Sequence, residues 1–124
     1  MAETVLVTGA GGFIGHHLVN KLVADGHVVR GVDIVEPEFA TTSAQEFELL
    51  DLRRWDNCLQ ATRGISHVYN LAADMGGIGY ITAYLADIAR NNSLINLHML
   101  EAARVNGVSR YFYSSSACVY PDYR

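Results

Sequence analysis

The stretch "VTGAGGFIG", residues 7–15, decides the fold because its glycines recur at three-residue intervals where an apolar run ends. The preceding residues 4–7, "TVLV", have the β-branched composition of a buried strand, and helical apolar spacing follows. Gly9 suits a tight turn, Gly12 a close approach of backbone to a pyrophosphate, and Gly15 close packing of helix on strand. The N–H groups at the helix start would then face phosphates. The stretch predicts a dinucleotide-binding turn.

A carboxylate follows this turn at the spacing that a dinucleotide site requires. Asp33 ends a second expected strand, Val28–Asp33, about 20 residues after Gly12. There it would accept hydrogen bonds from an adenosine ribose and repel a 2′-phosphate, which favours NAD over NADP. Arg30, within the same strand, is poorly placed to reverse that preference. The alternative is an ordinary turn followed by a strand-ending aspartate.

Asp51 is a second candidate carboxylate. It follows a third expected strand, residues 46–50, and so lies at the edge of the sheet where an adenine ring would rest. The alternative is that Asp51 caps a helix that begins at "LRRW". The sequence alone leaves both interpretations open.

The remaining sequence alternates β-branched runs with longer helical stretches. Strands are expected at residues 4–7, 28–33, 46–50, 67–73 and 110–116, and helices at 13–24, 52–62 and 84–106. Residues 34–45 and the glycine-rich "DMGGIGYI", 74–81, are expected loops. This alternation predicts an α/β fold: a Rossmann-like, doubly wound parallel sheet of five strands in the order 3-2-1-4-5, with helices on both faces. Residues 1–124 form one domain in this interpretation.

The composition excludes several classes of protein. Of the 124 residues 50% are apolar, and the net charge of −4 comes without a basic stripe, so we expect a globular domain that binds no nucleic acid. We see no signal peptide and no membrane-spanning run, and we expect a cytoplasmic protein without a membrane partner. Cys58 and Cys118 lack metal-ligand spacing and the histidines are scattered, so no metal site is expected. Cys58, beside Leu59 on an expected helix, should be a small buried side chain.

The ends of the first, fourth and fifth strands should line one crevice, because ligands bind beyond the carboxyl ends of the strands in open parallel sheets. The fourth strand ends in "NLAADMGGIG", whose small Ala72 and Ala73 would let the backbone approach the nicotinamide side of a cofactor. The fifth ends in "SSSACVY", which begins with Ser114. The alternatives are a structural loop after the fourth strand and, after the fifth, hydroxyls that cap a helix and a cysteine that only packs.

Taken together, "TGAGGFIG", Asp33, "NLAA", "NNS" in the long helix and "SSSACVY" resemble the extended short-chain dehydrogenase/reductase superfamily, which includes NAD-dependent epimerases and dehydratases. The resemblance covers nearly the whole chain. Within the superfamily, "NLAADMGGIGYI" and "YSSSACVYP" are similar to the GDP-mannose 3,5-epimerases. The resemblance implies NAD as cofactor, a nucleotide-sugar as substrate, with a GDP-hexose favoured, and a homo-oligomer.

The resemblance also assigns roles to residues. It implies transient oxidation of the sugar at C4 and inversion at C3 and C5, with Cys118 as the acid/base thiol and Ser116 as the serine that hydrogen-bonds the reacting hydroxyl. Gly76 and Gly77 match the loop that approaches the hexose, and Asn92 matches the helix asparagine near the cofactor. The implied cofactor-binding residues are Gly9, Gly12, Phe13, Ile14, Gly15, Asp33, Asp51, Leu52, Leu71, Ala72, Ala73, Asn92 and Ser114.

One departure from the superfamily's pattern concerns its Tyr-x-x-x-Lys pair, which should follow Ser116 by a few tens of residues. Tyr120 and Tyr123 come too soon, and no lysine follows Lys21. We therefore expect this chain to be the NAD-binding portion of a longer enzyme, without its substrate-binding domain and inactive alone. The alternatives are a standalone NAD-binding or regulatory module without turnover, and another nucleotide-sugar 4-epimerase or dehydratase.

Overall fold

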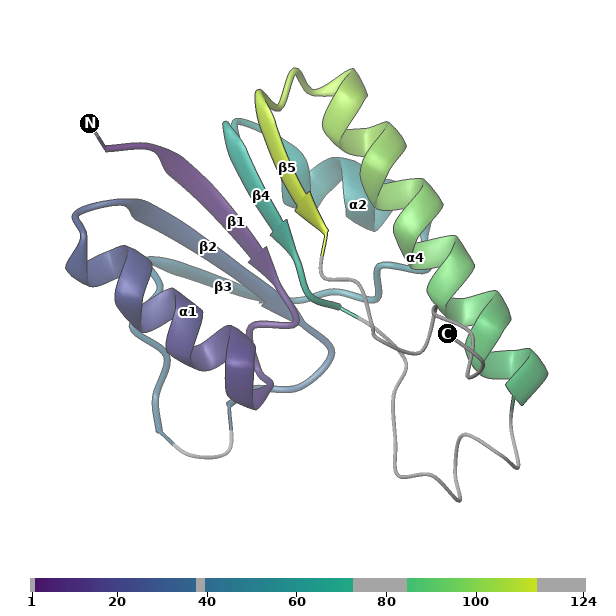
Figure 1. Ribbon diagram of the computed structural model, residues 1–124, viewed down its shortest axis with the longest axis horizontal. Coiled ribbons are helices and arrows are strands. Elements are labelled where there is room, and N and C mark those ends of the chain that lie inside the picture. The colour runs from purple at the N-terminus through teal and green to yellow at the C-terminus, as the bar shows by residue number, and fades with distance from the viewer. Residues whose placement is uncertain (1, 38–39, 73–84, 114–124) are drawn as a thin grey trace, which may run out of the picture.

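The computed structural model describes residues 2–37, 40–72 and 85–113. Within them lies a parallel sheet of five strands in the order β3-β2-β1-β4-β5 (Figure 1). This confirms the expected α/β fold and strand order. The strands are β1 (Thr4–Thr8), β2 (Val28–Asp33), β3 (Glu46–Leu49), β4 (His67–Asn70) and β5 (Arg110–Tyr113), and the helices are α1 (Phe13–Ala24), α2 (Trp55–Thr62) and α4 (Leu85–Val105).

Within the described residues, two boundaries differ by more than one residue from those expected, each for a local reason. β4 ends at Asn70 rather than at residue 73, because the next two backbone N–H groups donate to the Thr8 hydroxyl at 3.0 Å each. α2 begins at Trp55 rather than at residue 52, because Asp51 first forms a turn in which its carbonyl accepts from the Arg54 N–H at 3.2 Å. The expected end of the fifth strand, residues 114–116, lies outside the described residues.

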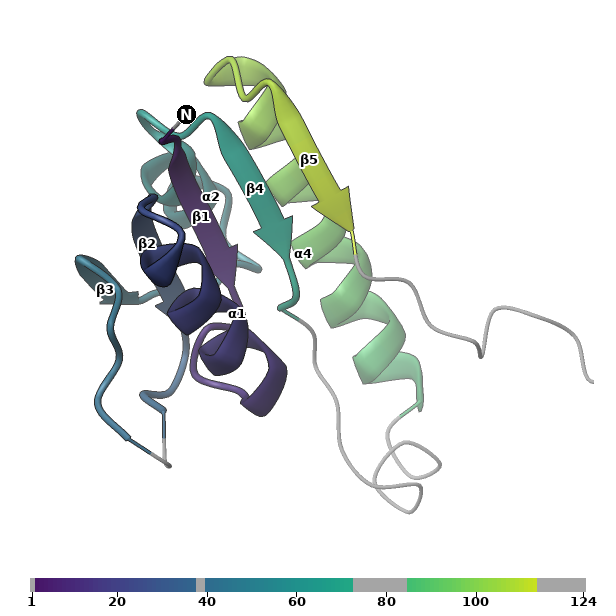
Figure 2. The ribbon, with the colours of Figure 1, turned by 60° about the vertical axis from the view of Figure 1, so that its left-hand side comes forward.

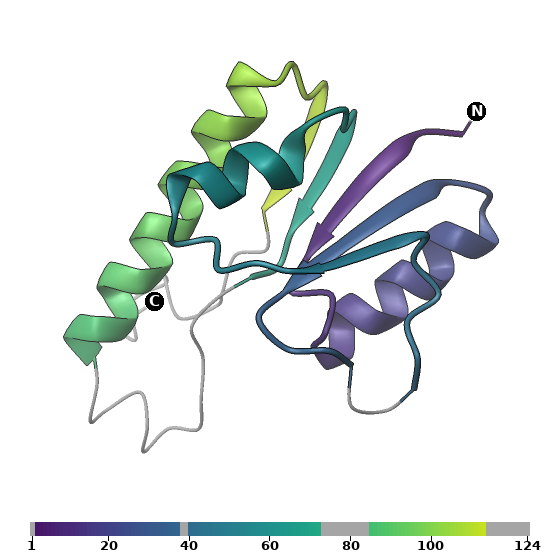
Figure 3. The ribbon, with the colours of Figure 1, turned by 180° about the vertical axis from the view of Figure 1, so that it is seen from behind.

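The helices cover opposite faces of the sheet. α1 packs on β1 and β2 on one face, and α2 and α4 contact each other on the other (Figure 1, Figure 3). Strand alternation sorts the apolar side chains of β1, with Val5 and Val7 in the α1 core and Leu6 in the other. The α1 core comprises Val5, Val7, Ala10, Val19, Leu22 and Val29. The opposite core comprises Leu6, Val32, Leu52, Cys58, Ala61, Ile65, Val68, Ile95, Met99 and Ala102.

A buried polar network joins β1, β4 and β5 near the carboxyl ends of these strands. The Thr8 hydroxyl donates to Asn70 Oδ1 at 2.6 Å, and Asn70 Nδ2 donates to the Tyr111 hydroxyl at 2.9 Å. Thr8 is 0% and Asn70 2% exposed, and burial raises the pKa of Tyr111 to about 12. Because β3 and β5 form the two edges of the sheet (Figure 2), the network lies away from the β3 edge and fixes where the chain leaves β1 and β4.

Cys58 on α2 is fully buried, as expected, and its thiol donates to the carbonyl of Leu52 at 3.1 Å. Burial raises the pKa of this thiol to about 12, and the carboxylates of Asp51 and Asp56 add to the effect. The thiol is therefore protonated at neutral pH, and its side chain packs in the core.

Candidate functional site

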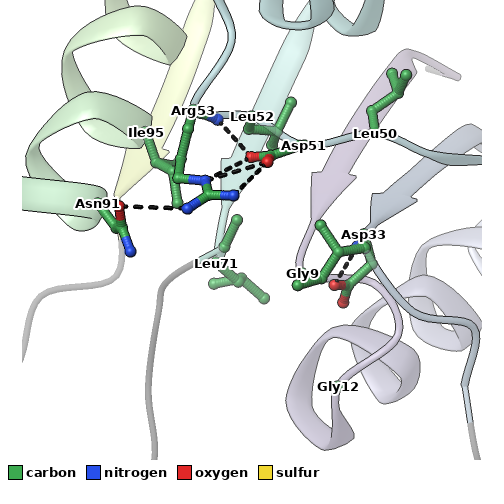
Figure 4. A pocket seen from close by; sticks show the side chains of 12 residues that line it. Gly9, Gly12, Asp33, Leu50, Asp51, Leu52, Arg53, Leu71, Asn91 and Ile95 are labelled. Atoms are coloured by element: carbon green, nitrogen blue, oxygen red, sulfur yellow. Dashed lines mark hydrogen bonds and ion pairs between the residues drawn. The ribbon is translucent and has the colours of Figure 1, made fainter. Parts of the chain in front are cut away.

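A cavity of about 430 Å³ opens where β1, β2 and β4 end (Figure 4). Its size falls within the range of about 300–1,000 Å³ that is usual for small-molecule sites. It lies at the edge of the sheet where the sequence predicts a ligand, close to the point where the strand order reverses. The lining residues are Gly9, Gly12, Asp33, Ile34, Leu50, Asp51, Leu52, Arg53, Leu71, Ala72, Asn91 and Ile95.

The turn between β1 and α1 is built from glycines for steric reasons. Gly9 has a φ of 71°, and a Cβ there would lie 2.9 Å from the backbone carbonyl carbon of Leu71. A Cβ at Gly15 would collide with the Gly9 carbonyl oxygen. Gly12 differs, because the nearest atom to a Cβ there is that same oxygen at 3.4 Å. The fold thus requires Gly9 and Gly15, whereas Gly12 leaves room for a ligand.

The amino terminus of α1 is suited to an anion. In the described part of the chain, no side chain caps the helix at Gly12, and its first turn holds no acidic side chain. Phe13 and Ile14 begin the helix with side chains 64% and 71% exposed, and neither lines the cavity. Since apolar side chains do not bind phosphate, the contact predicted for these two residues is through their backbone N–H groups.

Asp33 ends β2 on the cavity wall and is held there by backbone donors. Its Oδ2 accepts from the Gly11 N–H at 2.8 Å, and its Oδ1 from the Ile34 N–H at 2.6 Å. Gly11 is a residue that the three-residue spacing did not single out. A Cβ there would collide with the Val35 carbonyl oxygen and lie 3.0 Å from Asp33 Oδ2. The additional glycine in "GAGG" was the sequence signal that could have identified Gly11. A glycine is required there because the loop after β2 packs closely against it.

Arg30, also on β2, is committed elsewhere. Its Nη1 donates to the carbonyls of Ala61 and Arg63 at 2.8 Å each, and its Nη2 lies 3.4 Å from Glu46 Oε1. The guanidinium therefore sits at the carboxyl end of α2, where a cation is favourable. This placement accords with the expectation that Arg30 does not serve a 2′-phosphate.

Asp51 lies on the cavity wall between β3 and α2. Its Oδ1 accepts from the Arg53 N–H at 3.0 Å, and its Oδ2 from Arg53 Nη2 at 2.6 Å. The N-cap residue of α2 is Arg54, so the alternative interpretation of Asp51 as the cap of that helix is wrong. The side-chain hydrogen bond from Arg53 holds the pKa of Asp51 below its usual value, against the opposing effect of partial burial. Leu52 is 3% exposed and belongs to the core.

Arg53 and Asn91 are two cavity residues that sequence reasoning missed. Arg53 Nη1 donates to Asn91 Oδ1 at 3.4 Å, which links the segment after β3 to α4. Asn91 is 8% exposed and lines the cavity. Its neighbour Asn92, indicated by the "NNS" pattern, is half-buried on the same helix and does not line the cavity. The two consecutive asparagines indicated this part of α4, but the sequence pattern did not show which of the two asparagines lines the cavity.

The structure brings most of the described cofactor candidates around one cavity. Those that line it are Gly9, Gly12, Asp33, Asp51, Leu52, Leu71 and Ala72. Four more candidates are described but do not line the cavity: Phe13, Ile14, Gly15 and Asn92. The remaining candidates, Ala73, Gly76, Gly77, Ser114, Ser116 and Cys118, lie outside the described residues. Within residues 2–37, 40–72 and 85–113, no three His, Cys, Asp or Glu side chains are grouped to hold a metal ion, and no helix is long and apolar enough to cross a membrane.

Comparison with known proteins places these features in a family context. Residues 5–124 match the NAD dependent epimerase/dehydratase family. The chain is 50% identical over 122 residues to GDP-mannose 3,5-epimerase 1 of Oryza sativa subsp. japonica, an alignment that covers 97% of this chain and 32% of that enzyme. The chain therefore spans about a third of the length of the curated relatives it matches.

Solved structures share the fold across nearly the whole chain. An epimerase from Methanothermobacter thermautotrophicus superposes with a TM-score of 0.87 at 28% identity, over 98% of this chain and 38% of that one. A short-chain dehydrogenase/reductase superfamily protein from Agrobacterium tumefaciens, solved with bound NAD, superposes with a TM-score of 0.81 at 30% identity, over 98% of this chain and 35% of that one.

Proposed function

Because the chain belongs to the NAD-dependent epimerase/dehydratase family, we propose that residues 1–124 form the NAD-binding domain of a nucleotide-sugar epimerase resembling GDP-mannose 3,5-epimerase. The family uses NAD, and the 50% identity to the rice enzyme supports the narrower assignment. The observation that carries the cofactor assignment is the Asp33 carboxylate. The Gly11 N–H holds it at the end of β2, on the wall of a cavity that the open backbone of Gly12 also lines.

The lining fits the adenosine diphosphate part of NAD. Asp33 would accept hydrogen bonds from the ribose hydroxyls, and the space at Gly12 would admit the pyrophosphate at the start of α1. The apolar side chains of Leu71 and Ile95, which line the cavity together with Asp51, would pack against adenine (Figure 4).

The proposed reaction divides between the cofactor and side chains of this chain. When bound, NAD supplies a reversible oxidation of a sugar hydroxyl. Ser116 would hydrogen-bond the hydroxyl at C4, and Cys118 would be one member of an acid/base pair at C3 and C5, because a ketone at C4 acidifies the protons on its neighbouring carbons. One member, as the base, would remove a proton from one face of the carbon, and the other, as the acid, would deliver a proton to the opposite face, which inverts the centre. Gly76 and Gly77 would contact the hexose of a GDP-sugar. These four residues rest on the family resemblance alone, since they lie outside the described residues.

Calorimetric titration with NAD tests the cofactor assignment. We expect the wild-type protein to bind NAD and to prefer it to NADP. The Asp33→Asn variant should bind NAD about tenfold more weakly, because an amide offers one acceptor oxygen and no charge to the ribose hydroxyls. Asp25→Asn is the matched control, since Asp25 is exposed and pairs with Lys21 at 3.2 Å. A wild-type protein that binds neither NAD nor ADP-ribose would overturn the proposal.

Solvent deuterium exchange tests the proposed chemistry. In a form of the protein that also carries the Tyr-x-x-x-Lys pair, GDP-mannose in D₂O should acquire deuterium at C3 and C5. Cys118→Ala should abolish this exchange, and Cys58→Ala should not, because Cys58 is buried in the core. Unchanged exchange in Cys118→Ala would remove that thiol from the mechanism. Turnover of UDP- or dTDP-sugars instead would identify a 4-epimerase or dehydratase.

A second candidate function is an NAD-binding module without turnover. Its test is the superfamily's tyrosine–lysine pair, which residues 1–124 do not contain because no lysine follows Lys21. This candidate shares the NAD site but predicts no exchange under any condition. The two are distinguished by whether that pair is supplied by further sequence or by a partner chain.

A further inference from the structure

Among the residues that the structure describes, Arg53 alone holds the Asp51 carboxylate, and it does so at several points. The Arg53 backbone N–H donates to Oδ1 at 3.0 Å, Nε lies 3.0 Å from Oδ1 and 3.1 Å from Oδ2, and Nη2 lies 2.6 Å from Oδ2. From its other side the guanidinium donates to Asn91 Oδ1 at 3.4 Å (Figure 4). It is thus bracketed between a carboxylate after β3 and a buried amide on α4, and all three side chains line the cavity.

Stability alone does not account for this arrangement. The Asp51 and Arg53 side chains are 34% and 46% exposed, and exposed ion pairs contribute little to the free energy of unfolding. The planar guanidinium of Arg53 contacts both oxygens of the Asp51 carboxylate, and it therefore restricts the orientation of that carboxylate. The neighbouring Arg54 offers a contrast. It is 69% exposed, lies 3.7 Å from Asp56, and does not line the cavity.

We propose that Arg53 sets the selectivity of this site for adenine, as a positioning residue that acts through Asp51. The inference rests on the proposed NAD-binding function and deepens it. A carboxylate has about four acceptor positions, and three N–H groups of Arg53, one of them shared between both oxygens, contact this one. We infer that the guanidinium holds the group so that the acceptor position left over stays on the cavity wall that Asp51 lines. A fixed acceptor selects a purine with an amino group at C6. A purine with a carbonyl oxygen there would place two acceptors against each other, which specific sites use to reject a ligand.

The Arg53 guanidinium is essential to this selection, because an Asp51 carboxylate that is not held in place can turn away from a carbonyl oxygen on the base. Without Arg53, the Asp51 side chain would be free to rotate towards solvent, or to take a water between itself and a carbonyl oxygen. Both dinucleotides would then be accepted to a similar extent. Selectivity thus depends on orientation rather than on the presence of the carboxylate alone.

Calorimetric titration with NAD and with nicotinamide hypoxanthine dinucleotide tests the proposal. The second compound carries a carbonyl oxygen in place of the adenine amino group. We expect the wild-type protein to prefer NAD by at least about tenfold. In Arg53→Gln the preference should fall to within about threefold. Arg53→Lys keeps the positive charge but not the planar pair of donors, so it should also lose the preference for NAD. Arg54→Gln is the matched control and should keep the wild-type ratio.

A second variant, Asp51→Asn, distinguishes a change of selectivity from a general loss of binding. Asp51→Asn presents an amide that can donate to the hypoxanthine carbonyl, so the preference should level or reverse. A wild-type ratio in Arg53→Gln would overturn the proposal, and so would an equal loss of affinity for both dinucleotides, which would mean a direct contact or a folding role. If the wild-type protein binds both equally, the inference fails and the proposed function stands. If it binds neither, both fail.

Discussion

Replacing Gly11 by alanine should destabilise the fold, whereas replacing Gly12 should spare it. A Cβ at Gly11 would collide with the Val35 carbonyl oxygen and lie 3.0 Å from Asp33 Oδ2. One neighbour is backbone and the other is the carboxylate that Gly11 itself binds, so relief requires a shift of the loop after β2. At Gly12 the nearest atom to a Cβ is 3.4 Å away, and the extended backbone there, with φ −82° and ψ 174°, suits alanine.

The magnitude follows from two contacts. Overpacking costs about 1–3 kcal/mol, and loss of the 2.8 Å hydrogen bond from the Gly11 N–H to the charged Asp33 costs about 1.5–3 kcal/mol. Because one movement causes both, the two costs are not additive, and we expect the free energy of unfolding to fall by about 3 kcal/mol. That is a large part of the stability of a domain of this size. Gly12→Ala loses only a favourable N-cap residue, at about 0.5–1 kcal/mol.

Urea denaturation followed by circular dichroism measures both variants, and NAD titration separates stability from binding. Gly12→Ala should remain folded yet bind NAD at least about tenfold more weakly, because its methyl group occupies space that the pyrophosphate needs. Two results would refute the reasoning. One is a Gly11→Ala variant that unfolds at the wild-type urea concentration. The other is a Gly12→Ala variant that is destabilised as much as Gly11→Ala.

Two further predictions concern buried groups. Thr8→Val should lower the free energy of unfolding by about 2–3 kcal/mol, because it removes the acceptor of two backbone N–H groups and takes the Thr8 donor away from the buried Asn70 Oδ1. Thr8→Ser keeps the hydroxyl, and urea denaturation should show that it loses much less. The folded pKa of Cys58, about 12, exceeds its ordinary value of 9.0, so the contribution of Cys58 to the free energy of unfolding should be constant below pH 9 and fall above it as the unfolded thiol ionises. Between pH 9 and pH 10, below the ordinary pKa of Tyr111, the loss should be at most about 1 kcal/mol per pH unit. Cys58→Ala should lack this dependence, and an unchanged pH profile in that variant would contradict the assignment.

The sheet and the glycine turn were predictable because their signals are local. Strand alternation and helical spacing need only a window of residues, and they gave the strand order through the handedness of the crossovers. Gly15 must be a glycine because a Cβ there would collide with the carbonyl oxygen of Gly9, a residue of the same turn. Asp33 was predictable because a strand–helix–strand unit has a fixed geometry, which places the end of β2 beside that turn.

The contacts that complete the site were not predictable, because each joins residues distant in the sequence. Thr8 and Asn70 are 62 residues apart, and Arg53 and Asn91 are 38 apart. Threonine, arginine and asparagine have many possible partners, so their residue types do not specify these pairs. Asp51 illustrates the same limit, since a helix cap and a cavity residue share one sequence pattern. A single turn before α2 decides between them.

The two carboxylates of the cavity differ in charge environment, and in the proposed NAD site this difference would matter more for specificity than the glycine turn does. Asp51 is balanced by a guanidinium, whereas in the described part of the chain the Asp33 carboxylate accepts from the neutral backbone N–H groups of Gly11 and Ile34. The uncompensated carboxylate is the stronger acceptor for hydroxyl donors and repels a further phosphate, which suits a ribose with both hydroxyls free. The balanced and oriented carboxylate adds little net charge and discriminates by the direction of a donor, which suits a base. A glycine turn at a helix start receives any phosphate-bearing ligand. In the proposed NAD site, selection of one dinucleotide would therefore depend on how differently these two aspartates are partnered.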